Sequence, residues 1–155
     1  MPDFVKSETV PGTAADPWAY LGSDVLVVAQ DLVPAASGDA NVCHGLACLV
    51  QDLVHRLGTP RGDLPLHPEY GFDIARFLHL DTSPVHVLDF EQSVQEEVEN
   101  DPRVQPGTAS VSVLSSDRDC IRFRVQFQPV GATNPLNLVL GYDLSTVTLE
   151  VVRGG

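Results

Sequence analysis

Three short runs decide how this chain folds: HRLGTPRGD at residues 55–63, HPEYG at residues 67–71 and ENDPRV at residues 99–104. The first run places a Thr-Pro pair after a leucine-rich segment, and a residue that precedes proline disfavours the helical conformation. In the last run Pro102 stops an acidic segment, after which apolar and polar residues begin to alternate. The runs therefore predict a rigid link between two helices, and a junction between the second helix and a sheet.

Residues 42–57 predict the first of these helices, because apolar residues recur there at spacings of three and four. Asp39 or Asn41 could cap its start, and Gly58 suits the left-handed position after its last turn. The expected apolar face consists of Val42, Leu46, Leu49, Val50, Leu53 and Leu57.

The opposite face of this predicted helix carries His44, Cys48, Gln51 and His55, a set that raises the question of a metal site. His44 and Cys48, one turn apart, could bind a cation together. However, His55 follows His44 by eleven residues, about 16 Å along a helix axis. A structural zinc ion normally needs four ligands within reach, so we favour a semi-polar face turned to solvent or to another subunit. We expect no metal ion and no other cofactor.

Asp81-Thr82-Ser83-Pro84 predicts the start of the second helix, over residues 84–100, with a shorter helix before it at residues 72–80. Its expected apolar face consists of Val87, Phe90, Val94 and Val98. Its expected acidic face carries Asp89, Glu91, Glu96 and Glu99.

Paired carboxylates such as Glu96 and Glu97 suggest glycosidase chemistry, in which two acids flank the scissile bond. Adjacent residues on a helix point about 100° apart, however, and neighbours at that spacing do not face each other. We therefore favour a solvated acidic helix face.

The rest of the chain predicts antiparallel strands near residues 109–114, 120–129, 136–142 and 146–153. In the second of these, Ile121, Phe123, Val125 and Phe127 alternate with polar residues and should form a buried face. The last is rich in Val and Thr and could lie at an open sheet edge, which invites strand addition by a partner.

These elements predict an α+β fold, in which helices pack against a mostly antiparallel sheet in a single compact domain. Residues 24–155 would form this domain, and residues 1–23, rich in Pro, Gly, Ala, Ser and Thr, an extended N-terminal arm. Within the domain, residues 24–32 predict one further strand and residues 34–41 a turn-rich connector.

Composition limits the classes of partner. The 155 residues carry a formal charge of −12, with 21 acidic residues against 9 basic ones, and such a surface repels nucleic acids and anionic membranes. No run approaches the roughly 18–20 apolar residues that span a bilayer, and we see no secretory signal. The odd count of cysteines, Cys43, Cys48 and Cys120, favours free buried thiols and folding in a reducing compartment.

The chain contains no motif that identifies an enzyme. It lacks a Gly-rich phosphate loop, a G-x-S-x-G elbow and a His-Glu-x-x-His sequence. Arg61-Gly62-Asp63 is too short a match to indicate integrin binding. We therefore expect a protein that is not an enzyme.

The order of these features resembles the baseplate wedge family of contractile phage tails, which includes baseplate assembly protein W, its lysozyme-like relatives and the sheath initiators of related injection systems. The matching runs are VQDLVHRLGTPRG at residues 50–62, HPEYG at residues 67–71 and NDPRV at residues 100–104. They are similar to the family's progression of a helix, L-x-T-x-x-G, P-x-Y-G and then E/D-P-R-V. The similarity covers residues 24–130.

This resemblance implies a structural protein of the baseplate that anchors to wedge proteins and initiates sheath polymerisation by strand pairing. The partner-binding residues would be Asp101, Pro102, Arg103 and Val104, at the position of the family's Glu-Pro-Arg word. Asp101 keeps the charge but is one methylene shorter than Glu, whereas Arg103 keeps the planar donor fork suited to bidentate pairing.

The implied partners are sheath protein, baseplate wedge proteins and the tube or hub proteins, in multiple copies with sixfold symmetry. Neither nucleic acid nor direct membrane insertion is expected. The protein would be cytoplasmic during assembly and then part of the baseplate of a phage tail or a tail-like particle. Two alternatives remain open: a lysozyme-like peptidoglycan hydrolase of a tail baseplate, and a cytosolic adaptor domain.

Overall fold

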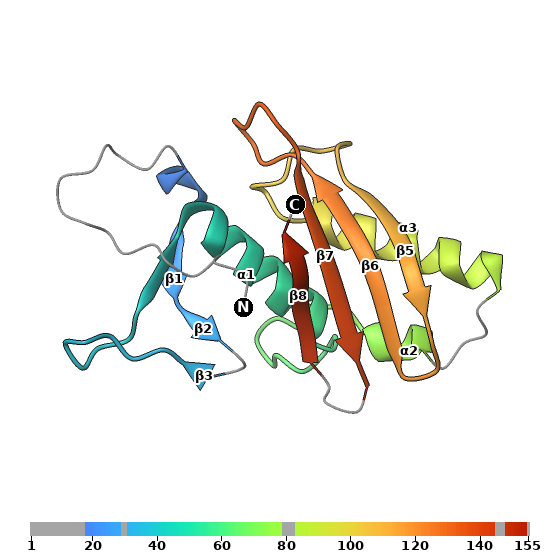
Figure 1. The fold of residues 1–155 in the computed structure, drawn as a ribbon, viewed down its shortest axis with the longest axis horizontal. Coiled ribbons are helices and arrows are strands. Elements are labelled where there is room, and N and C mark those ends of the chain that lie inside the picture. Colours follow the sequence, from blue (N-terminus) through green and yellow to red (C-terminus); the bar gives the residue numbers. More distant parts are fainter. Residues whose placement is uncertain (1–17, 29–30, 79–82, 145–147, 155) are drawn as a thin grey trace. The chain divides into compact units, whose positions relative to one another are not determined.

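The computed structural model describes residues 18–28, 31–78, 83–144 and 148–154 and confirms the α+β class (Figure 1). The described chain divides between Leu53 and Val54 into two compact units. Most of the predicted N-terminal arm lies outside the described residues.

The first unit contains a 3-10 turn, η1 (Ala19–Leu21), and two small antiparallel pairs of strands. β1 (Ser23–Val25) pairs with β4 (Val42–His44), and β2 (Val27–Val28) pairs with β3 (Asp31–Leu32). The connector of residues 34–41 is confirmed as a loop, closed by a bridge between Pro34 and Ala40.

The prediction of one continuous strand over residues 24–32 was wrong. The side chain of Gln51 binds the backbone on both sides of Leu26: its Oε1 accepts from the Val27 N–H at 3.0 Å, and its Nε2 donates to the Val25 carbonyl at 2.8 Å. Leu26 itself donates to the Asn41 carbonyl at 2.7 Å. The Leu26 carbonyl accepts from the Val33 N–H at 3.1 Å, so the pairing partner changes at Leu26 from β4 to β3 and the strand is broken there. Gln51 binds the opposite edge of the same stretch.

The first helix, α1 (Gly45–Gly58), begins three residues later than predicted, because residues 42–44 are held in β4. Gly45 has φ +60°, a left-handed conformation that glycine adopts readily, and its N–H donates to the Gly22 carbonyl at 2.9 Å. Neither Asp39 nor Asn41 is therefore a cap. Gly58 is the last residue of the helix rather than a residue beyond it.

The second unit contains α2 (Ile74–Leu78), α3 (Pro84–Glu99) and a four-stranded antiparallel sheet. The sheet order is β5-β6-β7-β8, so β8 lies at an edge, as predicted. The strands are β5 (Ser110–Ser116), β6 (Cys120–Phe127), β7 (Leu136–Asp143) and β8 (Thr148–Gly154).

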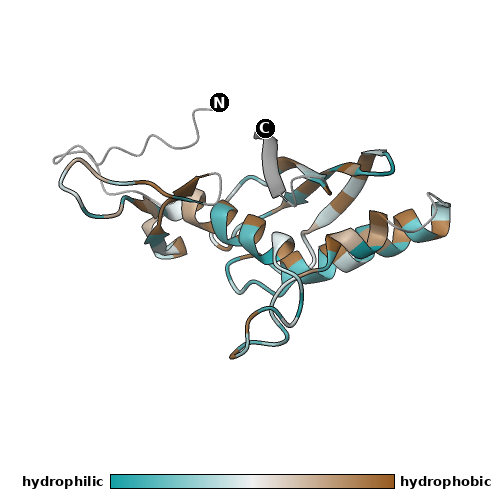
Figure 2. Ribbon diagram, turned by 90° about the horizontal axis from the view of Figure 1, so that it is seen from below, coloured by the Kyte–Doolittle hydropathy of each residue, from teal (hydrophilic) through white to brown (hydrophobic). Residues whose placement is uncertain are grey.

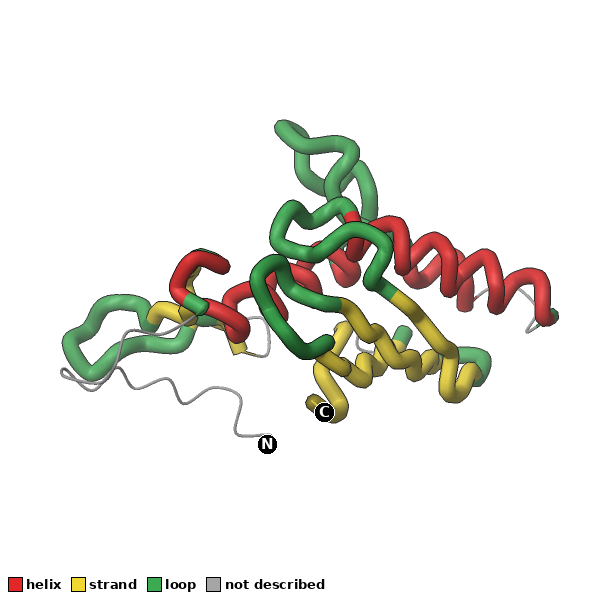
Figure 3. Tube along the Cα trace, turned by 90° about the horizontal axis from the view of Figure 1, so that it is seen from above, coloured by secondary structure: helices red, strands yellow, loops and turns green. Residues whose placement is uncertain are grey.

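The predicted start of α3 is confirmed within the described residues. Ser83 is its N-cap, with its side chain accepting from the His86 N–H at 3.5 Å, and Pro84 occupies the first turn. The helix packs on one face of the sheet (Figure 3), where aromatic rings meet edge to face: the Phe90 and Phe123 centroids are 5.1 Å apart. Phe77 adds a second ring 5.2 Å from Phe90.

The buried faces follow the predicted periodicities in this unit. Phe90, Val94 and Val98 of α3 are buried, whereas Val87 is only half-buried. On β6 the predicted face is buried throughout: Ile121, Phe123, Val125 and Phe127. Figure 2 shows hydrophobic and hydrophilic residues alternating along α3, as expected for a helix with one side on a core.

All three cysteines are free, as predicted; Cys43 and Cys48 are buried and Cys120 is half-buried. Among the described residues, no helix is both long and apolar enough to cross a membrane.

Candidate partner-binding site

The predicted partner-binding segment lies where α3 ends. Asn100 is the C-cap, and its N–H donates to the Glu96 carbonyl. The chain then turns: the Asp101 N–H donates to the Val98 carbonyl at 3.2 Å, and the Val104 N–H donates to the Asp101 carbonyl at 3.0 Å. Pro102 fits this turn because it cannot continue a helix and supplies no N–H that would need a partner.

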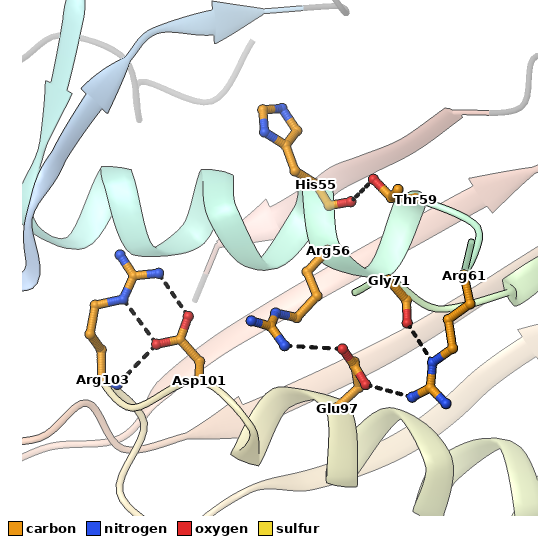
Figure 4. A network of polar contacts seen from close by, with 8 residues as sticks. All are labelled: His55, Arg56, Thr59, Arg61, Gly71, Glu97, Asp101 and Arg103. Atoms are coloured by element: carbon orange, nitrogen blue, oxygen red, sulfur yellow. Dashed lines mark hydrogen bonds and ion pairs between the residues drawn. The ribbon is translucent and has the colours of Figure 1, made fainter. Parts of the chain in front are cut away.

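Arg103 closes onto Asp101 through two side-chain bonds and one backbone bond (Figure 4). Its Nε donates to Asp101 Oδ1 at 2.9 Å, and its Nη2 donates to Oδ2 at 2.7 Å. Its backbone N–H also donates to Oδ1 at 2.9 Å. This bidentate pair fixes the orientation of the guanidinium group.

The pKa of the Asp101 carboxyl is lowered from its ordinary value of 3.8. Burial acts to raise this pKa, but the side-chain and backbone hydrogen bonds from Arg103 and the charges of Arg103 and Arg56 outweigh it. The carboxylate is therefore ionised at neutral pH, as the bond to Arg103 requires.

The same segment is tied to the sheet just beyond β6. The Val130 N–H donates to the Arg103 carbonyl, and the Gln105 N–H donates to the Gln128 carbonyl, each at 2.8 Å. An isolated antiparallel bridge joins Val104 to Pro129 between these bonds. The backbone around Arg103 is therefore fixed both by the turn at the end of α3 and by hydrogen bonds to residues 128–130.

The four predicted residues differ in their exposure to solvent. Asp101 and Val104 are buried, whereas Pro102 is exposed and the Arg103 side chain is 24% exposed. Pro102 and part of the Arg103 side chain are therefore at the surface, whereas Asp101 is buried beneath Arg103.

A second polar cluster lies on the same unit and centres on Glu97, whose side chain is only 2% exposed. Arg56 Nη1 donates to Glu97 Oε1 at 3.1 Å, and Arg61 Nη2 donates to Oε2 at 3.0 Å (Figure 4). The Arg56 guanidinium also lies over the Tyr70 ring, 4.9 Å from its centroid. The buried carboxylate thus joins the end of α1 and the following link to α3.

One side-chain and one backbone hydrogen bond hold together the two ends of the link between α1 and α2. Arg61 Nε donates to the Gly71 carbonyl at 3.0 Å, and the Phe72 N–H donates to the Thr59 carbonyl at 2.7 Å. The loop of residues 59–73 projects on the side of α3 away from the sheet (Figure 3). The prediction of a rigid link between two helices is consistent with this closure.

The prediction of a solvated acidic face on α3 was wrong for three of its glutamates. Glu97 is buried between two arginines. Glu91 Oε1 accepts from the Val113 N–H at 2.8 Å, and Glu99 Oε1 accepts from the Gly107 and Ala109 N–H groups at 3.1 and 3.2 Å. These carboxylates bind defined partners on the adjacent sheet edge and the link, whereas Glu96 is exposed as predicted.

Sequence reasoning missed Glu97 as a structural residue, although a signal was present. Glu97 follows Phe90 by seven residues and Val94 by three, which places it on the buried stripe of the helix. A carboxylate at such a position needs a cationic partner, and Arg56 at the end of α1 and Arg61 in the following link were available.

The polar set considered for a metal site does not come together as expected. His44 lies in β4 rather than in the helix, Cys48 is buried in α1, and His55 is exposed. The prediction that Cys48 belongs to an outward face was therefore wrong. In the described part of the chain, no three His, Cys, Asp or Glu residues form a group that could hold a metal ion.

Comparison with known proteins gives one informative likeness. No protein-family model matches the chain, and no curated protein matches it. Among solved structures, the chain is similar to the crystal structure of a "putative tail lysozyme" from Geobacter sulfurreducens, with a TM-score of 0.51 and 18% identity. The match covers 62% of this chain and 87% of that one. At this identity the likeness shows a shared fold.

Proposed function

We propose that this protein is a structural component of the baseplate of a contractile injection machine. It anchors to wedge proteins through the surface formed by Pro102 and Arg103, and it initiates sheath polymerisation by strand pairing at β8. It is not an enzyme, and it becomes part of a phage tail or tail-like particle in several copies. Its further contacts would be with tube or hub proteins.

The observation that carries the link to a tail is the fold shared with the Geobacter protein, which is named a "putative tail lysozyme". The ordered runs HRLGTPRGD, HPEYG and ENDPRV support the narrower assignment to the wedge family, which they resemble. The runs contribute the end of α1, the link and the end of α3.

The anchor is supported by the way Arg103 is held. Asp101 fixes the guanidinium in one orientation before any partner arrives, so little conformational entropy is lost on binding. Part of the side chain reaches the surface next to the exposed Pro102. Arginine on a rigid support is a common anchor in protein interfaces.

The structure dictates how the anchor must be tested. An Arg103→Ala variant alone would leave the buried Asp101 carboxylate without its main partner, and this would destabilise the fold by about 3–5 kcal/mol. The double variant Asp101→Asn/Arg103→Ala removes the guanidinium without leaving that buried charge, since the Asn oxygen can still accept the backbone N–H of residue 103. Asp101→Asn keeps Arg103 and is the matched control for folding. Because it also loosens the hold on Arg103, the wild type is the control for incorporation.

We expect the double variant to unfold at a temperature close to that of the control but to be absent from purified particles. Immunoblots of particles would measure its incorporation, and thermal unfolding would confirm the fold. Incorporation of the folded double variant at the level of the wild type would contradict the anchor.

Strand pairing at β8 has a separate test. Deletion of residues 145–155 should yield particles whose baseplates lack sheath in electron micrographs, because it removes β8, the strand that we propose pairs with a sheath arm. Normal sheaths on particles that contain the shortened chain would exclude β8 as the initiating strand.

A peptidoglycan hydrolase is a second candidate, because the Geobacter protein is called a lysozyme. The acids considered for that chemistry do not form a pair: Glu96 is exposed, and both oxygens of Glu97 are bound by arginines. A zymogram with the purified chain tests this candidate, since a cleared band would establish peptidoglycan hydrolysis. A cytosolic adaptor is distinguished by its gene neighbours, which would not encode sheath and tube proteins.

A further inference from the structure

The two edges of the four-stranded sheet are not equivalent. Among the described strands, β5 and β8 each have a neighbour on one side only. An edge strand presents backbone N–H and C=O groups that can pair with another chain, and proteins commonly protect such edges.

At the β5 edge, backbone N–H groups donate to carboxylates of α3. Glu91 accepts from the Val113 N–H at 2.8 Å, and Glu99 accepts from the Ala109 N–H at 3.2 Å. In an antiparallel strand the N–H groups of alternate residues point to the same side, and Ala109 and Val113 are four residues apart. Glu91 therefore occupies a donor of β5 that faces away from β6, and Glu99 binds the N–H of Ala109, the residue directly before β5.

The spacing along the two elements matches. Eight residues of helix separate Glu91 from Glu99, about 12 Å, and four residues of extended chain separate Ala109 from Val113, about 13 Å. One face of α3 can therefore bind both points without distortion.

Two other features make β5 a poor template. The register with β6 shifts between Val113 and Ser115, which leaves Leu114 as an extra residue in a bulge. In addition, α3 crosses β5 and continues past this edge of the sheet (Figure 1). A bulged edge whose Val113 donor is already bound by Glu91 is a poor template for a regular ladder with an incoming strand.

We propose that α3 closes the β5 edge through Glu91 and Glu99, so that an extended arm of a partner joins this sheet only at β8. This deepens the proposed function, because a subunit that accepts a strand on one edge starts a polymer in one direction. Glu91 and Glu99 are then the residues that determine which edge is used.

The closure is tested on the purified full chain without any particle. Amide hydrogen exchange followed by NMR should show protected N–H groups at Ala109 and Val113. In Glu91→Ala the Val113 amide should exchange about tenfold faster, the factor expected for the loss of a hydrogen bond to a charged acceptor. Glu96→Ala is the matched control, since Glu96 is exposed on the same helix.

The double variant Glu91→Ala/Glu99→Ala opens the edge, and it should form larger species in sedimentation velocity as concentration rises. Glu91→Gln/Glu99→Gln should stay the size of the wild type, because the amide oxygens still accept. A double alanine variant with wild-type size and wild-type amide exchange would overturn the proposal. If the alanine variant does not fold, through-bond NMR coupling between the Glu91 carboxyl and the Val113 N–H decides in the wild type, and its absence would overturn the closure.

The edge that a partner uses is then located by adding a purified sheath protein of a contractile tail. Its addition should slow exchange in residues 148–154 and leave residues 110–116 unchanged. Slowed exchange in residues 110–116 would overturn the proposal. If sheath protein does not bind at all, the proposed function fails, while the exchange and sedimentation results still decide whether the β5 edge is closed.

Discussion

Glu97 illustrates how one residue can be both polar and structural. It lies on the buried stripe of α3, where an unpaired carboxylate would be costly, and two arginines bind its two oxygens. The arginines differ in their surroundings: the Arg56 side chain is 21% exposed and the Arg61 side chain 59% exposed. Arg61 therefore retains solvent as an alternative partner, whereas Arg56 depends more on Glu97.

Glu97→Gln should lower the free energy of unfolding by about 1–3 kcal/mol, the cost of losing hydrogen bonds between charged groups. Urea unfolding measures this change. Glu96→Gln, one residue earlier and exposed, should change it by less than about 0.5 kcal/mol. Equal effects of the two substitutions would show that the buried cluster does not stabilise the fold.

Asp101 makes stability depend on pH in a known direction. Its folded-state pKa lies below the ordinary 3.8, so its contribution is fully present above pH 3.8 and is lost as the pH falls through the lowered folded-state value. The difference in unfolding free energy between the wild type and Asp101→Asn should therefore be constant from pH 7 to pH 5 and shrink below pH 3.8. A difference that grows on acidification would contradict the assigned direction.

At the scale of elements, the link of residues 59–73 depends on one close backbone approach. Gly71 has φ +105°, and a Cβ built there would meet the Thr59 carbonyl oxygen. Gly62, in the same link, has φ +91° but no atom within 4 Å of such a Cβ. An alanine at residue 62 would therefore cost backbone strain alone, whereas an alanine at residue 71 would cost strain and steric overlap together.

Gly71→Ala should destabilise the protein by more than about 3 kcal/mol, because strain and overlap add. Gly62→Ala should cost only about 1–2 kcal/mol, the strain alone. Thermal unfolding of both variants measures the difference. Similar melting temperatures would mean that the link relaxes away from the close contact.

Local patterns predicted the elements of the second unit well. Pro84 and Ser83 set the start of α3, and strict alternation from Ile121 to Phe127 set the buried face of β6. The first unit was predicted less well, because its strands are short and its geometry depends on a distant side chain. Gln51 binds the backbone of Val27 and Val25 across 24 and 26 residues of sequence, which no local pattern contains.

In the candidate site, too, local patterns were predictable from the sequence and long-range contacts were not. The run from Asp101 to Val104 was singled out because its proline ends a helix and because it resembles the family's Glu-Pro-Arg word, and its partner-binding role stays a prediction. The burial of Asp101 and Val104 was not, since it depends on the segment's bonds to residues 128–130. The hydrogen bonds from the edge of β5 to Glu91 and Glu99 were likewise not predictable. A glutamate on a helix is expected to face solvent unless the neighbouring element is known.

The net charge of −12 leads to a prediction for the whole molecule. Three of the nine basic residues, Arg56, Arg61 and Arg103, are already paired with carboxylates. Labelled double-stranded DNA should therefore show no change in fluorescence anisotropy up to about 100 μM protein, the weak limit of non-specific binding. A rise in anisotropy below that concentration that weakens with added salt would indicate a basic surface patch despite the negative net charge.

The burial of two of the three thiols makes the natural chain ready for single-site labelling. Cys43 and Cys48 are shielded, so a maleimide reagent should attach one fluorophore, at Cys120 on the first residue of β6. Desolvation and the nearby charge of Asp143 raise the pKa of this thiol, so the reaction should be slow at neutral pH and faster in alkaline buffer. Cys120 pairs with Asp143 on β7, one strand away from the β8 edge, so a dye there could report the arrival of a partner strand without any engineered cysteine.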